Sequence, residues 1–467
     1  MYENIKGNLK ESRFIVPFSY KGNYIEVAGR IKEDWDLMMP PQTEQDIYEY
    51  VAKSLYLSDA ELEKRTGSIG SLWSRRNDGN IQFPILGYKE SDDENIYPIT
   101  FKNMGMSLFR NGLGFIWYDV LLNGSDKKPL NTNIIVNFQN RFKELNLHSN
   151  IRRIVLINNM QAEPFMMGKW ISQVLSKHFG EIKFYPGRLD CQKGTAHKIV
   201  PDKAVLFNYF ILYDKEDMEL QKKLTLRLSS GYNTNYKVST FDDTKLFMPF
   251  ENVHWNISKE GCGCCVSTKM KDPFFEKIFP DKVRNDYFTL YLLLLYQSYS
   301  LLMYAEKIET NFSSDPQYYL NNKDNSNIQA FLAEMNTFLL KSTHVSVSHI
   351  QHQNDFYNYG MKELRIYEDI KSVMAGADTL DEMQKLVENR EKEDHDSKIN
   401  TALALLAVWA LFSALTDGLA FVDWIFFNEK LLSNPLYCIV SILIATIIFA
   451  IGLIALFRIL PRKNKRK

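Results

Sequence analysis

The sequence lacks an excess of charge of either sign and is poor in cysteine. Its 467 residues include 56 Lys and Arg, 56 Asp and Glu, and five cysteines. Proteins that bind nucleic acid concentrate basic residues to displace counterions, so this balance excludes a general nucleic-acid binder. The cysteines are odd in number, and three crowd together at Cys262, Cys264 and Cys265. This pattern excludes a disulfide framework and fits a reducing compartment.

Strong metal and catalytic motifs are also missing. His254 precedes Gly261–Cys265, but a structural zinc site needs two separated ligand pairs, so we expect a glycine-rich turn with free thiols. His344, His349 and His352 lie on a predicted helix, and only the last two share a face, so we expect no histidine metal site. No Ser-His-Asp, Cys-His or paired-carboxylate motif is evident. We therefore expect no enzyme and no resident cofactor or metal.

Charge is nearly absent near the C-terminus, where residues 399–457 contain four charged side chains in 59 positions. Ile399–Thr416 and Leu431–Phe457 are uncharged runs of 18 and 27 residues, which predicts two transmembrane helices joined by a short hairpin. Residues 458–467 then carry six basic residues and no acid, and the positive-inside rule places this tail in the cytoplasm. The rest of the chain is mildly acidic.

The first ten residues are polar and no secretory apolar region follows them. Two spans then place both termini in the cytoplasm, which predicts a multi-pass membrane protein. The composition, rich in Lys, Asn and Ile, is compatible with a bacterium and hence with its inner membrane. A third uncharged run, Tyr287–Ala305, contains five tyrosines together with Thr, Gln and Ser residues. Such polar groups are costly in the bilayer unless they are partnered, so we expect a buried helix of a helical bundle, with a span as the alternative.

The region before the spans divides into two predicted parts. Residues 1–272 form an α/β or α+β ligand-sensing domain, and residues 273–398 form a helical bundle and stalk. Strands are predicted at Phe14–Ser19, Tyr24–Ile31, Ile151–Ile157, Glu181–Tyr185, Lys203–Leu212 and Leu224–Leu228. Helices are predicted at Gln42–Leu57, Asn131–Leu145, Glu163–Phe179, Asp281–Glu309, Asn327 to about Val373, and Leu380–Ser397. The strand-helix-strand order around Glu163–Phe179 predicts a partly parallel sheet.

The helix at Leu380–Ser397 meets no Pro or Gly before the first span. It is therefore expected to start after Gly376 and to continue into the membrane. An N-terminal α/β domain, a helical region, a long helix that becomes the first of two spans, and a basic tail together resemble the CorA superfamily of cation channels. The resemblance implies a homopentamer whose long helices form a stalk and whose first span lines the pore.

That family ends its first span with a Gly-Met-Asn motif, and this sequence has Thr416-Asp417-Gly418 there, which argues against magnesium selectivity. The longer N-terminal domain looks like that of the CRISPR-associated CorA-like membrane proteins of type III systems. This resemblance implies an antiviral effector opened by a nucleotide second messenger, a conjugate of S-adenosylmethionine and AMP. The alternatives are a divalent cation transporter with a diverged motif and a membrane-anchored nucleotide-binding adaptor without a pore.

One face of the first span carries residues at spacings of three and four. They are Asn400, Ala404, Ala407, Leu411, Ala414 and Gly418, with Asp417 at the outer mouth. A ring of Leu411 side chains would gate by dewetting, and acids at the entrance, such as Glu393 and Asp396, would attract cations. The alternatives are small-residue packing between helices and a solvated charged surface.

Two segments are candidate ligand sites. The loop 65–76 combines glycines and hydroxyls with Arg65, Trp73, Arg75 and Arg76, which suit phosphate and a base, although it is not a Walker loop. The second set comprises Arg152 and Arg153 of the predicted strand Ile151–Ile157 together with Asn158 and Asn159, which follow it. Ligands favour the carboxyl ends of parallel strands. For each segment a plain surface loop is the alternative.

Overall fold

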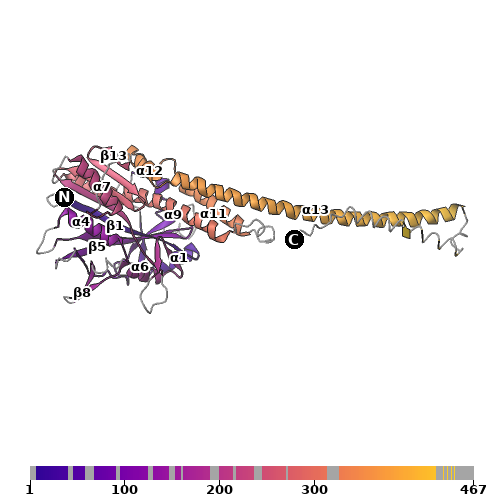
Figure 1. Ribbon diagram of the computed structural model, residues 1–467, viewed down its shortest axis with the longest axis horizontal. Helices are drawn as coiled ribbons and strands as arrows, with labels where there is room; N and C mark the ends of the chain where they lie inside the picture. The colour runs from indigo at the N-terminus through magenta and orange to yellow at the C-terminus, as the bar shows by residue number, and fades with distance from the viewer. Residues whose placement is uncertain are drawn as a thin grey trace. The chain divides into compact units, whose positions relative to one another are not determined.

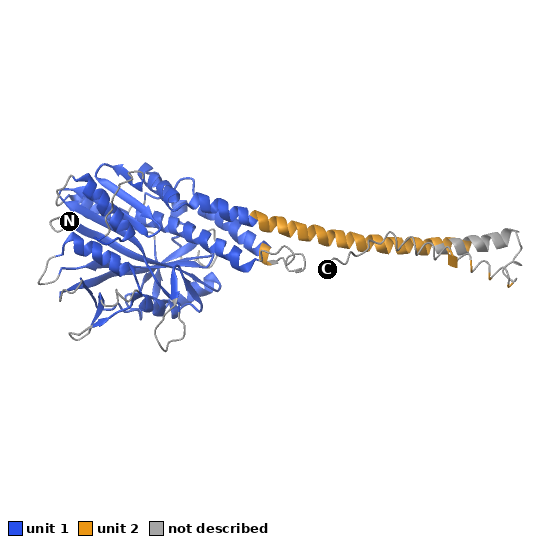
Figure 2. Cartoon of the chain, in the orientation of Figure 1, with its two compact units in different colours: residues 1–312, 329–377 blue, residues 313–328, 378–467 orange. Residues whose placement is uncertain are grey.

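A broad β-sheet with helices on both faces forms most of the first 312 residues (Figure 1). The computed structural model describes residues 7–39, 46–57, 68–90, 95–124, 130–146, 153–158, 161–189, 199–213, 217–235, 245–269, 272–312 and 326–426, with five single positions between 435 and 447. The chain divides into two units, residues 1–312 with 329–377 and residues 313–328 with 378–467 (Figure 2). The prediction of a mixed α/β N-terminal region followed by a helical part is confirmed.

Within the described residues the main sheet has thirteen strands and is almost wholly antiparallel. Its hydrogen-bonded order is β13 (Phe247–Phe250), β14 (Val253–Ser258), β15 (Gly261–Thr268), β12 (Val205–Tyr213), β1 (Gly7–Tyr20), β6 (Leu113–Leu122), β5 (Ile96–Phe109), β4 (Leu86–Lys89), β7 (Ile154–Asn158) and β8 (Gln161–Pro164). Beside this path, β2 (Trp35–Leu37) pairs with β3 (Gly70–Arg75), β3 with β5, and β9 (Ile182–Phe184) with β1. A separate ribbon pairs β10 (Gly187–Leu189) with β11 (Ile199–Pro201).

Helices of the first unit cover both faces of this sheet. They are α1 (Tyr24–Ile31), α2 (Glu49–Ala52), α4 (Thr132–Lys143), α6 (Met167–Ser176), α7 (Met218–Ser230), α8 (Phe279–Lys282), flanked by the π-helical turns Phe274–Ile278 and Val283–Tyr287, α9 (Phe288–Asn311), and α12 (Gln351–Glu363). Alternation along β1 explains the two layers: Phe14 packs edge-on against Phe142 of α4, whereas Arg13 lies under the Phe288 ring of α9.

The predicted buried helix at Tyr287–Ala305 is α9, and its burial is confirmed. Phe274–Asn311 is the one segment among the described residues with the length and mean hydropathy of a span, and 78% of its most apolar window is buried. Two of its polar side chains have hydrogen-bond partners in the protein: Ser300 accepts from Asn111 at 2.8 Å, and Gln297 donates to Tyr357 at 2.7 Å. The helix packs on the sheet as well as on neighbouring helices, so its surroundings are more than a helical bundle.

Two predicted strands are helices. Tyr24–Ile31 is α1, because Tyr24, Val27, Ala28 and Ile31 recur at helical spacing and are buried, and the Asn23 side chain caps the first turn. Leu224–Leu228 lies inside α7, which Asp217 caps at its start and Gly231 ends at a φ of 61°. In both segments the caps and the buried face outweigh the high content of apolar residues.

The predicted parallel unit is also wrong. The strand after residue 153, β7, pairs antiparallel with β4 and β8, and β9 pairs antiparallel with β1. The parallel pair in the described sheet is β12 with β15, and α7 lies on the connection between them. Of the helix predicted at Gln42–Leu57, the described residues contain the short α2, and residues 40–45 lie outside them.

The segment Gly261–Cys265 is part of β15 and is not a turn. Its three cysteines are free and buried, and burial raises the pKa of each thiol. The glycines let α7 approach the strand, since a Cβ at Gly263 would lie 2.7 Å from the Ser229 nitrogen. The Gly-Cys pattern therefore reflects close packing between a strand and a helix.

Helices beyond the sheet are α11 (Ser326–Ser342) and α13 (Ile366–Phe426), which is continuous over 61 residues. The prediction of one long helix that continues into the apolar run is confirmed as far as Phe426, but its start is wrong. The helix begins at Ile366, after Arg365 with a φ of 59°, and passes through Gly376 without interruption. Gly376 packs beside α9, since a Cβ there would lie 3.1 Å from Ile308 Cδ1.

Candidate functional site

The predicted pore residues all lie on α13. Asn400, Ala407, Leu411, Ala414 and Asp417 have exposed side chains, Ala404 is half-buried, and Gly418 lies in the same helix. The entrance acids Glu393 and Asp396 are exposed on α13 as well. Most of the second predicted span, the basic tail, and the side chains of Phe412, Leu415 and Thr416 lie outside the described residues.

Large apolar side chains are exposed around this part of α13. The exposed fractions are 57% for Leu403, 64% for Leu406, 73% for Trp409 and 60% for Leu411. At 100° per residue these four positions point in different directions around the axis. A helix that is apolar all round is stable only when other protein or lipid covers it.

The predicted ligand loop does not gather its cations in one place. Trp73 is fully buried in the sheet and donates to Ser71 at 2.8 Å. Arg75 donates to the Ile81 carbonyl at 2.9 Å and lies over the Phe83 ring. Arg76 pairs at the surface with Asp36 and Asp78, at 3.4 and 3.3 Å, and Arg65 lies outside the described residues.

The second predicted set surrounds β7. Arg153 precedes the strand and Asn158 ends it, while Arg152 and Asn159 lie outside the described residues. Because both neighbours of β7 are antiparallel, its carboxyl end is not the edge of a parallel sheet. Strand β7 therefore lacks the parallel neighbours on which the predicted ligand site depends.

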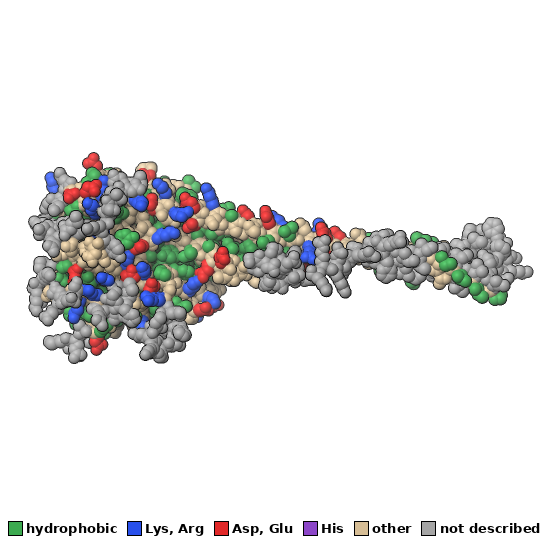
Figure 3. Space-filling model, in the orientation of Figure 1, with side chains coloured by type: hydrophobic (Ala, Val, Ile, Leu, Met, Phe, Trp, Pro, Cys, Tyr) green, Lys and Arg blue, Asp and Glu red, His purple; other side chains and the backbone are tan. Residues whose placement is uncertain are grey.

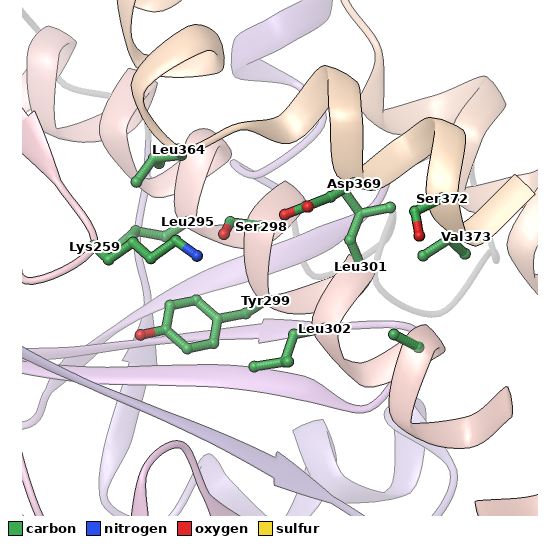
Figure 4. Close-up of a pocket in the computed structure, with 11 residues that line it drawn as sticks. Lys259, Leu295, Ser298, Tyr299, Leu301, Leu302, Leu364, Asp369, Ser372 and Val373 are labelled. Atoms are coloured by element: carbon green, nitrogen blue, oxygen red, sulfur yellow. The ribbon is translucent and has the colours of Figure 1, made fainter. Parts of the chain in front are cut away.

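A cavity of about 350 Å³ lies against the first turns of α13 (Figure 4). We call it the α13-base cavity. Its floor is the α9 face with Leu295, Ser298, Tyr299, Leu301, Leu302 and Ala305, and the remaining walls are Lys259, Leu364, Asp369, Ser372 and Val373. Lys259, from the β14–β15 turn, and Asp369, from α13, approach Ser298 from opposite sides (Figure 4). Any ligand or packing change here touches the start of α13.

A second cavity, of about 280 Å³, lies between α9 and α11 and is called the Arg110 cavity. Its lining is Ser68, Ile69, Arg110, Asn111, Tyr296, Tyr304, Ala333, Glu334, Thr337, Phe338 and Lys341. Ser68 and Ile69 belong to the loop that the sequence marked as a ligand site, although none of its predicted contact residues lines the cavity. Both cavities therefore border α9, on different faces of the helix.

Arg110, Lys341 and Tyr304 were not predicted as site residues. They come from the β5–β6 turn, α11 and α9, so no local motif contains them. One sequence signal exists, because Tyr304 belongs to the uncharged run Tyr287–Ala305, whose polar side chains predict a helix buried within the protein. On the face shown in Figure 3, basic and acidic side chains are mixed over the first unit.

The described residues contain no group of three or more His, Cys, Asp or Glu residues that could hold a metal ion. His254 Nε2 lies 2.9 Å from the Glu251 carbonyl. His254 belongs to β14 and pairs with Cys265 of the neighbouring strand β15.

No protein-family model matches this chain, and no curated protein matches it. Among solved structures, the chain is similar to the CorA magnesium transporter from Methanocaldococcus jannaschii, with 14% identity over 58% of this chain and 95% of the transporter. The TM-score is 0.25, which is too low to establish a shared fold or to match individual residues.

Proposed function

We propose that the chain is a ligand-gated, CorA-like membrane channel that a nucleotide second messenger opens. In this proposal several copies, as in a homopentamer, surround one axis with α13 lining the pore. The N-terminal α/β region and the basic tail face the cytoplasm of a bacterial cell. Ion flow then depolarises the membrane or arrests growth, as an antiviral effector of a type III CRISPR system would. The messenger is a conjugate of S-adenosylmethionine and AMP.

The continuity of α13 is the observation that carries this proposal. The helix is 61 residues long, which is about 90 Å at 1.5 Å per residue. Its first turns border the α13-base cavity, and its later turns expose Leu403, Leu406, Trp409 and Leu411. No loop interrupts the helix to absorb a displacement, so a rotation at Asp369 reaches Leu411.

The residues on the predicted pore face fit a weakly selective cation pathway. A ring of Leu411 side chains would close the pore by excluding water, which is how apolar constrictions gate. Asp417, at the end of that face, and the exposed acids Glu393 and Asp396, at its start, would raise the local concentration of cations. No stripped, tightly held ion is required by this arrangement.

Arg365 is the proposed pivot of the helix. Its φ of 59° is a left-handed conformation that costs a non-glycine residue about 1 kcal/mol. The residue joins α12 to α13, and α12 packs closely on α9, since a Cβ at Gly360 would lie 2.2 Å from Leu294. A ligand that shifts α9 would therefore act on α13 through both α12 and the α13-base cavity.

Conductance of the purified full chain in planar bilayers tests the function. We expect current only after the conjugate is added, carried by K⁺ and Na⁺ alike. Current carried by Mg²⁺ alone and independent of the conjugate would favour the divalent cation transporter. Conjugate binding without current under any ionic condition would favour the adaptor without a pore.

A further inference from the structure

The Arg110 cavity combines two cations that no carboxylate of the described residues neutralises. Arg110 donates to neutral acceptors, the Ser68 carbonyl at 3.1 Å and the Ser68 hydroxyl at 3.2 Å, and lies over the Tyr24 ring. Lys341 is exposed in the last turn of α11 and has no ion pair with a described residue.

The one acid in the lining is already neutralised. Both oxygens of Glu334 accept from Lys307, at 2.8 and 2.9 Å. Counted together with Lys307, which does not line the cavity, the charged groups at this site have a surplus of two positive charges, which is the complement of a phosphate group. Arginine is well suited to this role because its planar guanidinium makes paired hydrogen bonds to phosphate oxygens.

A buried hydroxyl also faces this space without a hydrogen-bond partner. Tyr304 is fully buried, and its hydroxyl lies near the side chains of Asn111 and Glu334, but none of these contacts has the geometry of a hydrogen bond. Burial raises the pKa of Tyr304, so the hydroxyl stays protonated and can act as a donor. A buried polar group without a partner costs about 1–3 kcal/mol, and a bound acceptor would remove that cost.

Aromatic rings form the remaining wall. Phe338 of α11 lies 5.6 Å from Tyr296 and 5.3 Å from Tyr304, both on α9. The Asn111 side chain, which donates to Ser300 at 2.8 Å, adds a polar amide at the edge. Aromatic walls beside two cations suit a flat base joined to a phosphate, because the rings contact the base and the cations contact the phosphate.

We propose that the Arg110 cavity binds the phosphate and base of a nucleotide, with the phosphate held by Arg110 and Lys341 and an acceptor of the ligand held by Tyr304. A volume of about 280 Å³ accommodates one nucleoside monophosphate group. This inference rests on the proposed function in one respect, because it takes the bound nucleotide to be part of the messenger.

Occupancy of this cavity would act on α9. Tyr296 and Tyr304 line the Arg110 cavity, while Leu295, Ser298 and Leu302 line the α13-base cavity on another face of the same helix. A ligand that draws α11 and the β5–β6 turn together would press on α9 and change the space at the start of α13. Binding and gating are thus separate steps, which separate experiments can measure.

Isothermal titration of the purified full chain in detergent tests the site, with AMP, adenosine and inorganic phosphate as probes. We expect saturable AMP binding that is tighter than binding of either fragment. Arg110→Gln and Lys341→Gln each weaken AMP about 10-fold or more, the usual effect of losing one charge-assisted hydrogen bond. Tyr304→Phe weakens it about 3- to 10-fold. Arg76→Gln, a surface arginine of the neighbouring loop, is the matched control and changes affinity less than about twofold.

Loss of binding counts only for variants whose thermal unfolding stays cooperative, and Lys341→Gln and Tyr304→Phe make small changes for that reason. No saturable AMP binding would overturn the proposal, as would unchanged affinity in both charge variants. Adenosine binding as tight as AMP would exclude a phosphate site, and equal affinity for inorganic phosphate would exclude the base. Because the titration needs no ion flow, a chain that binds AMP but never conducts would refute the proposed channel and leave the site intact.

Discussion

Asp286 offers a quantitative test of the packing around α9, because it is a carboxyl buried where its charge is unfavourable. It is 3% exposed, and burial together with the nearby Asp46 carboxylate raises its pKa from 3.8 to about 6. Lys282 pairs with Asp46, Gln353 donates to Asp46 at 3.3 Å, and His349 lies 3.9 Å from it. Lys282 and Gln353 also act on Asp286 itself and lower its pKa, but they offset the effect of burial only in part.

A folded-state pKa above the unfolded value means that Asp286 favours folding while it is protonated. Its contribution is present below about pH 4 and is lost as the pH rises through about 6. The difference between a pKa of 3.8 and one of about 6 corresponds to about 3 kcal/mol of stability, at 1.36 kcal/mol per pKa unit. The Asp286→Asn side chain is never charged. The free energy of unfolding of this variant should therefore exceed that of the parent by about 3 kcal/mol at pH 7.5 and should match it at about pH 4.

Urea unfolding of the full chain in detergent, followed by tryptophan fluorescence, measures this difference. Trp255 is a suitable reporter, since its ring stacks 4.6 Å from Tyr287, the residue after Asp286. Asp281→Asn removes an exposed carboxylate from the same segment and should change stability by less than about 0.5 kcal/mol at either pH. An Asp286→Asn variant that is no more stable than the parent at pH 7.5, or whose gain does not shrink on acidification, would refute the reasoning.

Three further perturbations follow from the packing and the predicted gate. Gly263→Ala should lower stability by about 1–3 kcal/mol in the same assay, because its Cβ would lie 2.7 Å from a backbone nitrogen of α7; Gly29→Ala, with open space around it, should not lower it. Asp119→Leu should lower the free energy of unfolding by about 3–5 kcal/mol, because it leaves Arg13 buried without its ion pair. Adding Arg13→Met should restore much of that stability. A double variant that is no more stable than Asp119→Leu alone would argue against an isolated ion pair. Leu411→Asn should conduct in bilayers without ligand, whereas Leu411→Ile should stay closed; equal silence of both would place the gate elsewhere.

The long helix and four strands of the main sheet, β1, β7, β9 and β12, could be predicted because their residues have a clear local preference. β1 and β12 are dense in Val, Ile, Phe and Tyr, and α13 has no proline along its length. The errors arose where local composition and tertiary context disagree. Tyr24–Ile31 reads as a strand by composition, yet its buried residues recur at helical spacing after a capping asparagine. Gly261–Cys265 reads as a turn, yet small residues are what a strand needs beneath a closely packed helix.

The candidate ligand site was harder to predict than the fold. The arginines of the loop 65–76 suggest a ligand site. In the structure, however, Arg75 donates to the Ile81 carbonyl and Arg76 forms ion pairs with Asp36 and Asp78. Arg110 and Lys341 stand more than 200 residues apart and meet only because α11 packs beside the β5–β6 turn. No spacing rule within one sequence brings a turn and a distant helix together. That the predicted pore residues share one helix face follows from helical periodicity, whereas their role in a pore stays a prediction that depends on the family resemblance.

Potassium release from liposomes that contain the full chain tests the central claim most directly. We predict release from the parent only when the S-adenosylmethionine and AMP conjugate is present. Arg110→Gln should need at least about ten times more conjugate, and Leu411→Asn should release potassium without it. Release from the parent that is the same with and without conjugate, or no release from either the parent or Leu411→Asn, would contradict a ligand-gated channel.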